Sequence, residues 1–255
     1  MTVPLKVWFE AEGRLLRLRL SRPKANLIDA AMIAALDSAL IEHLNNPAIG
    51  AVLLDAEGPH FSFGASVEEH LPGQCESMLR NLHRLILRLI ESPIPVLVAI
   101  RGRCLGGGLE VALAGHIIFV SPDCNLAQPE MNLGVFAPAA SCLLPELIGP
   151  ARAIDLLLSG RGITGTEAVA IGLAREASGD PERAALAYFD EQLKHKSASS
   201  LRFAVKAARF DYCARVRTKI EAVERMYLDE LMTTFDAVEG LNAFIGKRTA
   251  KWQHR

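Results

Sequence analysis

The chain has 255 residues and a mass of 27.7 kDa, and 50% of its residues are hydrophobic. Its formal net charge is −1, from 28 basic and 29 acidic residues, so no global field favours nucleic acid or an anionic membrane. The scattered cysteines lack the spacing of a disulfide framework or zinc site, and no apolar run suits a signal peptide or membrane span, so we expect a cytosolic protein.

Strands and helices alternate in the first half of the chain. Leucine and arginine alternate over residues 16–20, which predicts a half-buried strand, and residues 11–13 predict the turn of a hairpin. Asp29 caps a helix that ends near residues 45–47, and a second helix covers residues 75–90. Buried strands are predicted over residues 51–54, 96–100 and 117–120. This order predicts a mixed α/β layer structure with parallel strand pairing.

Helical patterns dominate from about residue 150 onward, where the strand signal disappears. Small polar residues at 195–200 interrupt the pattern, so we divide the chain into a core over residues 1–197 and a helical region over residues 198–255. Helices are expected over residues 150–158, 166–171, 181–193, 201–210, 216–232 and 235–248.

Two glycine turns follow predicted strands. Gly106-Gly107-Gly108 opens a helix, where uncovered backbone N–H groups and the helix dipole favour a negative ligand. Taken alone, three glycines are more typical of a tight turn or close helix packing. Gly64-Ala65 occupies the corresponding place after the preceding strand. In a parallel sheet both turns lie at the carboxyl ends of strands, so amides from the two could converge on one oxygen.

Two glutamates accompany these turns. Glu110 stands two residues beyond the last glycine, and Glu130 follows Pro129 after the third buried strand. Each alone fits an ordinary solvated residue of a first helical turn or a loop. Their shared neighbourhood makes them candidates for moving protons beside the amides.

The order and spacing of these segments resemble those of the motifs of a known family. Gly64-Ala65, then residues 106–110, then Gln128-Pro129-Glu130 followed by Leu133-Gly134, are similar to the successive signatures of the crotonase (enoyl-CoA hydratase/isomerase) superfamily. The resemblance runs from residue 21 to residue 248. It implies an α/β fold, a spiral of ββα units with a C-terminal helical trimerisation region. It also implies an acyl-CoA thioester as substrate, a homotrimer or dimer of trimers, and neither a metal nor a further cofactor.

The resemblance also assigns roles to individual residues. It implies that Glu110 and Glu130 are catalytic and that the N–H groups of Ala65 and Gly107 form an oxyanion hole. Four residues are expected to shape the acyl pocket, with ordinary core packing as their alternative role: Ser66, Phe136, Ala137 and Ala140. Six residues are expected to bind CoA, with surface lysines and packing residues as the alternative interpretation: Lys24, Ala25, Phe63, Ala65, Phe244 and Lys247.

One segment narrows the expected substrate. Residues 61–72 (FSFGASVEEHLP) resemble the cyclic dienoyl-CoA hydratases of this superfamily. This implies addition of water to cyclohexa-1,5-diene-1-carbonyl-CoA, giving 6-hydroxycyclohex-1-ene-1-carbonyl-CoA, in anaerobic degradation of aromatic compounds. The two histidines of the neighbourhood, His60 and His70, are expected to be structural or surface residues.

Two alternatives remain open. The first is a linear enoyl-CoA hydratase or an enoyl-CoA isomerase of the same superfamily. The second is a binding protein without catalysis, associated with RNA, for which Arg14, Arg17 and Arg19 offer a basic cluster. The near-zero net charge and the lack of a basic and aromatic stripe argue against the second.

Overall fold

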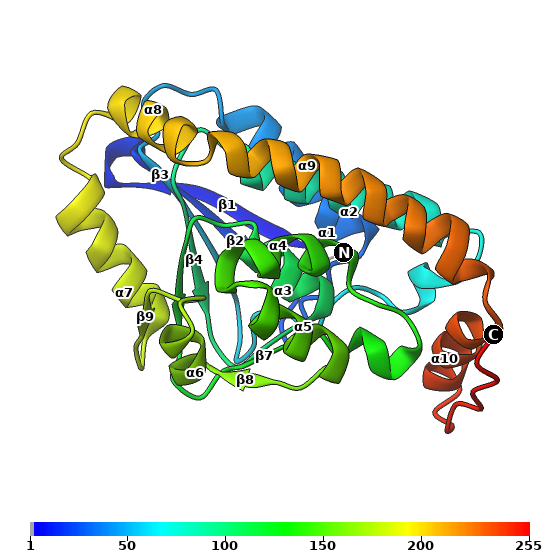
Figure 1. Ribbon diagram of the computed structural model, residues 1–255. Coiled ribbons are helices and arrows are strands. Elements are labelled where there is room, and N and C mark those ends of the chain that lie inside the picture. Colours follow the sequence, from blue (N-terminus) through cyan, green and yellow to red (C-terminus); the bar gives the residue numbers. More distant parts are fainter. Residues whose placement is uncertain (1–2) are drawn as a thin grey trace.

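A computed structural model describes residues 3–255 (Figure 1). Within those residues, the main sheet has the strand order β1-β2-β3-β4-β6-β9. The hairpin β1–β2 is antiparallel, and the other pairs of this sheet are parallel, as expected. The strands are β1 (Leu5–Glu10), β2 (Leu15–Leu20), β3 (Ala51–Ala56), β4 (Val96–Ile100), β6 (Ile117–Val120) and β9 (Glu176–Ala177).

Helices cover this sheet and continue beyond it. Asp29 caps the first helix as predicted, because its side chain accepts a hydrogen bond from the Met32 N–H. The helices are α1 (Ala30–His43), α2 (Cys75–Ile90), α3 (Gly106–Leu113), α4 (Pro138–Ile148), α5 (Pro150–Ser159), α6 (Gly165–Ala170), α7 (Pro181–Tyr188), α8 (Ala198–Ala208), α9 (Phe210–Arg225) and α10 (Phe235–Ile245).

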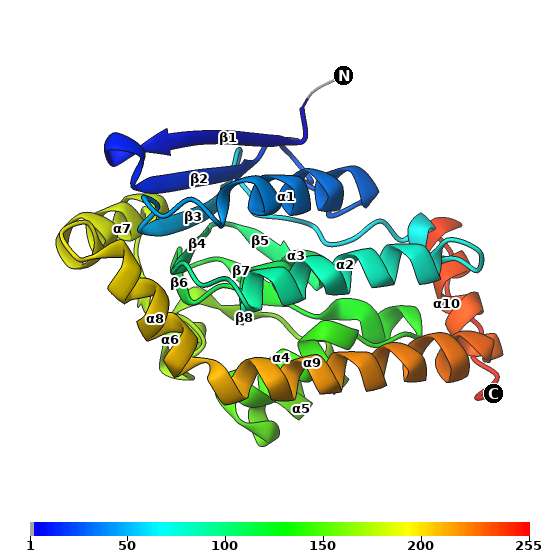
Figure 2. The ribbon, with the colours of Figure 1, turned by 90° about the horizontal axis from the view of Figure 1, so that it is seen from above.

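Alternate residues of each strand point to opposite faces of the sheet. Val52 and Leu54 of β3 pack into the main core with α1 and α2, whereas Ala51 and Leu53 belong to a second cluster that includes residues of α7. Both faces are therefore buried, which explains the unbroken apolar runs of the central strands. Figure 2 shows α1, α2 and α9 lying side by side, with α9 running toward α10 at one end of the molecule.

A small second sheet lies next to the two glutamates. Strand β5 (Arg103–Leu105) pairs in parallel with β7 (Asn125–Ala127), which pairs antiparallel with β8 (Ile163–Thr164). Strand β5 leads directly into α3, and β7 leads into a 3₁₀ turn over Pro129–Leu133. The sequence pattern does not predict this sheet, because two or three residues are too few for an alternation to be visible.

The second half of the chain differs from expectation in three ways. Strands continue after residue 150, because β8 and β9 lie there. Helix α4 was not predicted. The helices expected over 181–193 and 216–232 change to π-helical turns at Phe189–Leu193 and Met226–Glu230. Helix α8 begins at Ala198, where the helical region was placed, and the trimerising role of that region stays a prediction. Across residues 3–255, no helix combines the length and apolar character that crossing a membrane requires.

Candidate active site

The two glycine turns lie against each other. A Cβ atom at Gly64 would stand 3.2 Å from the Leu105 oxygen, and one at Gly107 would stand 3.3 Å from the Ala65 nitrogen. The Leu105 N–H donates to the Ser62 oxygen at 3.0 Å, which ties β5 to the first turn. Gly64 has a φ of +104°, a conformation that L side chains rarely adopt. Glycine is therefore required for this close approach of two backbones.

Two backbone amides meet where the turns touch. Gly107 is in the first turn of α3, where N–H groups have no acceptor within the helix. Ala65 lies beside it, and both residues line the same cavity. An amide in the first turn of a helix, with a second amide beside it, is a suitable arrangement for binding an oxyanion.

The cavity has a volume of about 530 Å³ and is lined mainly by apolar side chains. Leu79 and Leu82 of α2 form one wall, and Leu241 and Phe244 of α10 form another. Both glutamates and the two amides lie on its surface. This volume falls in the range of pockets that bury a small organic ligand.

Glu110 is held deep in the wall by α3. Its side chain is 3% exposed, and Oε1 accepts a hydrogen bond from the Ala140 N–H at 2.9 Å. Burial raises the pKa of Glu110, whereas the Ala140 N–H and the nearby His83 favour the ionised form and oppose that rise. The carboxyl group therefore has a defined orientation and one fixed donor.

Glu130 reaches the same place from the 3₁₀ turn. Its Oε1 lies over Gly106, which is one helical turn before Glu110 on the same face of α3. Burial, and then the negative charge of Glu110, raise the pKa of Glu130 to about 8, although part of its side chain remains accessible from the cavity. With its amide nitrogen turned toward this carboxyl group, the buried Gln128 donates to both oxygens, at 3.2 and 3.1 Å.

The remaining residues singled out from the sequence divide into two groups. Those in the cavity wall are Phe63, Phe136, Ala137 and Phe244. Ala140 and Ser66 are not part of the wall: Ala140 contributes its N–H to Glu110, and the Ser66 hydroxyl donates to Glu68 at 2.9 Å. Those outside the wall that were expected to bind CoA are Lys24, Ala25 and Lys247.

These three residues differ in their exposure and contacts. Lys24 and Lys247 are exposed and have positive φ values of 86° and 50°. Ala25 contributes its carbonyl oxygen, which accepts a hydrogen bond from the Phe63 N–H at 2.8 Å and so positions that ring at the cavity. Their contact with CoA stays a prediction.

Two ionisable wall residues were missed. The guanidinium carbon of Arg103 lies 5.5 Å from the centre of the Phe63 ring. Arg103 and Leu105 are two residues apart on β5, so their side chains point to the same face, and both line the cavity. This spacing was the signal in the sequence. His70, expected to be structural or at the surface, also lines the cavity, and its Nδ1 donates to the Ser66 oxygen at 2.7 Å. Burial lowers the pKa of His70, so this ring is neutral near pH 7. Among residues 3–255, no cluster of three or more His, Cys, Asp or Glu side chains could hold a metal ion.

Comparison with known proteins gives consistent matches over nearly the whole chain. The family model for enoyl-CoA hydratase/isomerase matches residues 10–255. A cyclohexa-1,5-dienecarbonyl-CoA hydratase from Thauera aromatica is 62% identical over 99% of this chain and 98% of its own length. A probable enoyl-CoA hydratase from Bacillus subtilis is 31% identical over 92% and 94% of the two chains. The structure of an enoyl-CoA hydratase/isomerase from Pseudoalteromonas atlantica matches with a TM-score of 0.86 and 26% identity, over 98% of this chain and 99% of the other.

Proposed function

The chain belongs to the enoyl-CoA hydratase/isomerase family, and within it we propose that the protein hydrates cyclohexa-1,5-diene-1-carbonyl-CoA to 6-hydroxycyclohex-1-ene-1-carbonyl-CoA. The observation that carries this proposal is the 62% identity, over 99% of the chain, to a relative named for hydration of that cyclic dienoyl thioester. The two glutamates beside paired amides supply the chemistry that such a hydration needs.

The proposed reaction begins with addition of water to the ring β-carbon, C2. As the oxygen of water bonds to C2, the electron pair of the C1–C2 double bond moves onto the thioester oxygen and gives an extended dienolate. The N–H groups of Ala65 and Gly107 would bind that oxygen. Because they are already oriented, they stabilise the charge most where it develops, in the transition state.

The two glutamates would share the proton transfers. Ionised Glu110 takes a proton from the attacking water, and protonated Glu130 delivers one to C5, at the far end of the dienolate. The remaining double bond then lies between C1 and C6, and renumbering of the ring gives the 6-hydroxy product. C2 and C5 lie opposite each other in the six-membered ring, so a pair of carboxyl groups suits the reaction. The raised pKa of Glu130, about 8, supports its role as the acid at neutral pH.

The wall of the cavity fits an apolar ring. Phe136 and Ala137 share this wall with leucines from two helices, and the wall holds few polar side chains, Glu110 and Glu130 among them. An apolar pocket with a few converging polar groups is the usual form of a small-molecule site. Phe63 and Phe244, at the same cavity, are the residues that we propose contact CoA together with Lys24, Ala25 and Lys247.

We further propose that the protein works as a homotrimer or a dimer of trimers in the cytoplasm, on a route that degrades aromatic compounds. Ile154 and Leu158 of α5 are 53% and 66% exposed, which supports burial against another copy. The cysteines form no disulfide in the described chain, which fits a reducing compartment.

The test is incubation of the purified protein with the cyclic dienoyl-CoA and, separately, with crotonyl-CoA, followed by chromatography of the products. We expect fast hydration of the diene, and a decrease in kcat of about 10²–10⁴-fold in Glu110→Gln and in Glu130→Gln. The exposed Glu176→Gln serves as the control and should retain full activity. Turnover of crotonyl-CoA alone would overturn the cyclic substrate and leave a linear enoyl-CoA hydratase.

A further inference from the structure

The segment that follows α10 is held along this helix by hydrogen bonds. The Lys251 N–H donates to Oε1 of Glu239 at 2.8 Å, and the Gln253 N–H donates to Oδ1 of Asp236 at 2.6 Å. Both acceptors are carboxylates of α10, beside which the chain ends in Figure 1. Trp252, between the two donors, therefore has a defined place although 42% of it is exposed.

The indole ring of Trp252 lies against two glycines. A Cβ atom at Gly134 would stand 3.0 Å from Cζ3 of this ring, and one at Gly240 would stand 2.9 Å from Cη2. Gly240 is inside α10, where glycine is less favourable than alanine. A Cβ atom there would also stand 2.0 Å from the Leu133 oxygen, so glycine lets the two backbones touch. We call this contact of Gly240 with Leu133 and Gly134, together with the Trp252 ring, the α10 joint.

The α10 joint connects two parts of the active-site cavity. Gly134 directly follows the 3₁₀ turn Pro129–Leu133, which carries Glu130. Leu241 directly follows Gly240 and lines the cavity. A shift of α10 relative to this turn would therefore move an apolar wall and a carboxyl group relative to each other.

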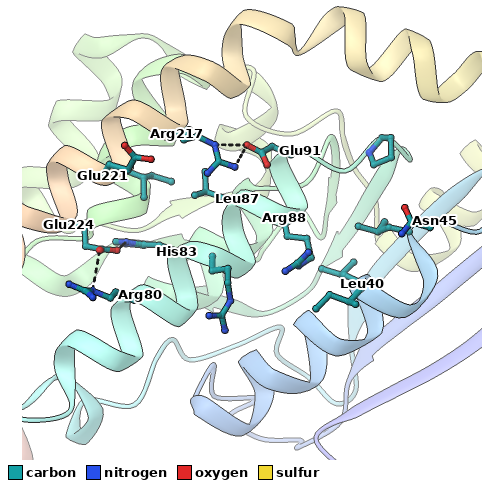
Figure 3. A pocket seen from close by; sticks show the side chains of 15 residues that line it. Leu40, Asn45, Arg80, His83, Leu87, Arg88, Glu91, Arg217, Glu221 and Glu224 are labelled. Atoms are coloured by element: carbon teal, nitrogen blue, oxygen red, sulfur yellow. Dashed lines mark hydrogen bonds and ion pairs between the residues drawn. The ribbon is translucent and has the colours of Figure 1, made fainter.

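The wall formed by α2 is held differently. Two ion pairs join α2 to α9 in a groove of about 600 Å³ that also borders α1 (Figure 3). Nε of Arg80 lies 3.7 Å from Oε1 of Glu224, and Nη2 of Arg217 lies 2.5 Å from Oε1 of Glu91, the residue after α2. Within the described chain, the only ion pair of α10 is with Arg248, just beyond its own end. The place of α10 therefore depends on packing at the α10 joint.

We propose that Trp252 is a positioning residue, which holds α10 on the turn that carries Glu130 and thereby fixes where this carboxyl group stands in the cavity. The inference rests on the proposed function, in which Glu130 is the acid. Trp252 is outside the cavity wall, so it acts on the site through Gly134 and the turn.

The first test measures the protonation of Glu130 without any substrate. Protein labelled with carbon-13 at glutamate carboxyl carbons is titrated by NMR, and the Glu130 signal is assigned by its absence in Glu130→Gln. The pKa of Glu130 is about 8 because the group is buried beside the charge of Glu110, so a displacement that admits water should lower it. We expect Trp252→Ala to lower the pH midpoint by about one unit, and Trp252→Phe, which keeps a ring at the α10 joint, to lower it less. The other ionisable groups of the wall, which both variants keep, are Glu110, Arg103 and His70.

The second tryptophan of the chain provides the matched control. Trp8 lies on β1, where the guanidinium carbon of Arg17 is 4.8 Å from the centre of its ring, and it is outside the cavity wall. Trp8→Ala removes the same side chain and so measures the effect of lost packing alone. The midpoint of Glu130 should stay unchanged in this variant.

Kinetics with the cyclic dienoyl-CoA give the second readout. In Trp252→Ala, kcat should fall about tenfold, because the acid is misplaced. The basic limb of kcat/KM should move down with the NMR midpoint, because Glu130 then loses its proton at a lower pH. Trp8→Ala should leave both unchanged.

Two outcomes decide against the proposal or replace a failed variant. An unshifted midpoint and basic limb in Trp252→Ala, with or without a loss of stability, would overturn the proposal and reduce the ring to a structural contact. Should Trp252→Ala fail to fold, Asp236→Ala releases the Gln253 N–H while the ring remains, and the same fall in midpoint is expected. Failure of the cyclic substrate alone leaves the NMR result valid, so the two proposals can fail separately.

Discussion

Oε1 of Glu130 lies 2.5 Å from the point where a Cβ atom would stand on Gly106. The carboxyl group thus occupies the space that any other residue would need for its side chain. We expect Gly106→Ala to displace Glu130 and to lower kcat about 10²-fold, because small misplacements of a reacting group have effects of that size. Steady-state kinetics with the cyclic dienoyl-CoA measure the change.

The control separates this displacement from backbone strain. Gly106 and Gly172 both have positive φ values, of 49° and 82°, but a Cβ atom at Gly172 would meet no atom within 4 Å. Gly172→Ala should therefore reduce stability while kcat is preserved. A Gly106→Ala variant with normal kcat would show that Glu130 does not need this position.

The activity should have a basic limb set by Glu130. Its pKa is about 8, so it holds a proton at neutral pH and loses it as the pH rises through that value. Because the proposed acid is the protonated form, kcat/KM should fall above about pH 8. A profile from pH 5 to pH 10 checks this, and a rate that keeps rising through pH 9 would contradict the assignment.

Arg103 should contribute to binding of the CoA part of the substrate. Its guanidinium lies on Phe63 at the cavity, and a guanidinium is a good partner for a phosphate. We expect Arg103→Ala to raise KM for the CoA thioester about tenfold with little change in kcat. The corresponding pantetheine thioester lacks the nucleotide phosphates, so its KM should not respond.

A second arginine provides the matched comparison. Arg175 lies over the ring of Tyr188, 4.6 Å from its centre, and is outside the cavity wall. Arg175→Ala should leave both KM values unchanged. An equal loss with the CoA and pantetheine thioesters would mean that Arg103 shapes the cavity and does not recognise phosphate.

Stability should depend on a buried ion pair in the main sheet. Arg17 and Asp55 are 2% and 3% exposed, and Nη2 of the arginine lies 2.5 Å from Oδ2 of the aspartate. Asp55→Ala removes the most buried partner of Arg17, which keeps Glu10 and Glu182, and should lower the free energy of unfolding by about 3 kcal/mol, the low end of the range for a broken buried pair. Unfolding by denaturant of the variant and the unchanged protein measures this difference. In comparison, Asp190→Ala breaks an exposed pair with Lys194 and should cost at most about 1 kcal/mol.

The parts of the fold with a strong local pattern are predictable from the sequence. Helix α2 and strands β4 and β6 have the expected bounds, because a long amphipathic period and buried apolar runs are both local signals. Strands β5, β7 and β8 are too short to show a period, and α4 contains two prolines, at 138 and 145, which resemble loop signals. These elements depend on tertiary pairing.

The same division holds for the site. The two glycine turns and the two glutamates lie together as expected, since each follows a strand of a parallel arrangement. The Ala140 N–H that binds Glu110 and the Trp252 ring that contacts Gly134 join residues far apart in the chain, so no local pattern indicates them. Ser66 turns its hydroxyl to Glu68 because the next residues form a 3₁₀ turn, which the sequence pattern does not show.

The amides of Ala65 and Gly107 are main-chain groups, and this affects how such a site can evolve. A single codon change can remove the carboxyl group of Glu110 or Glu130, but only replacement by proline removes an N–H group. Descendants of this sequence can therefore exchange their acids and bases while keeping the two amides that we propose bind the thioester oxygen. New reactions of thioesters can arise by changing the acidic side chains, because the backbone amides are inherited with the fold.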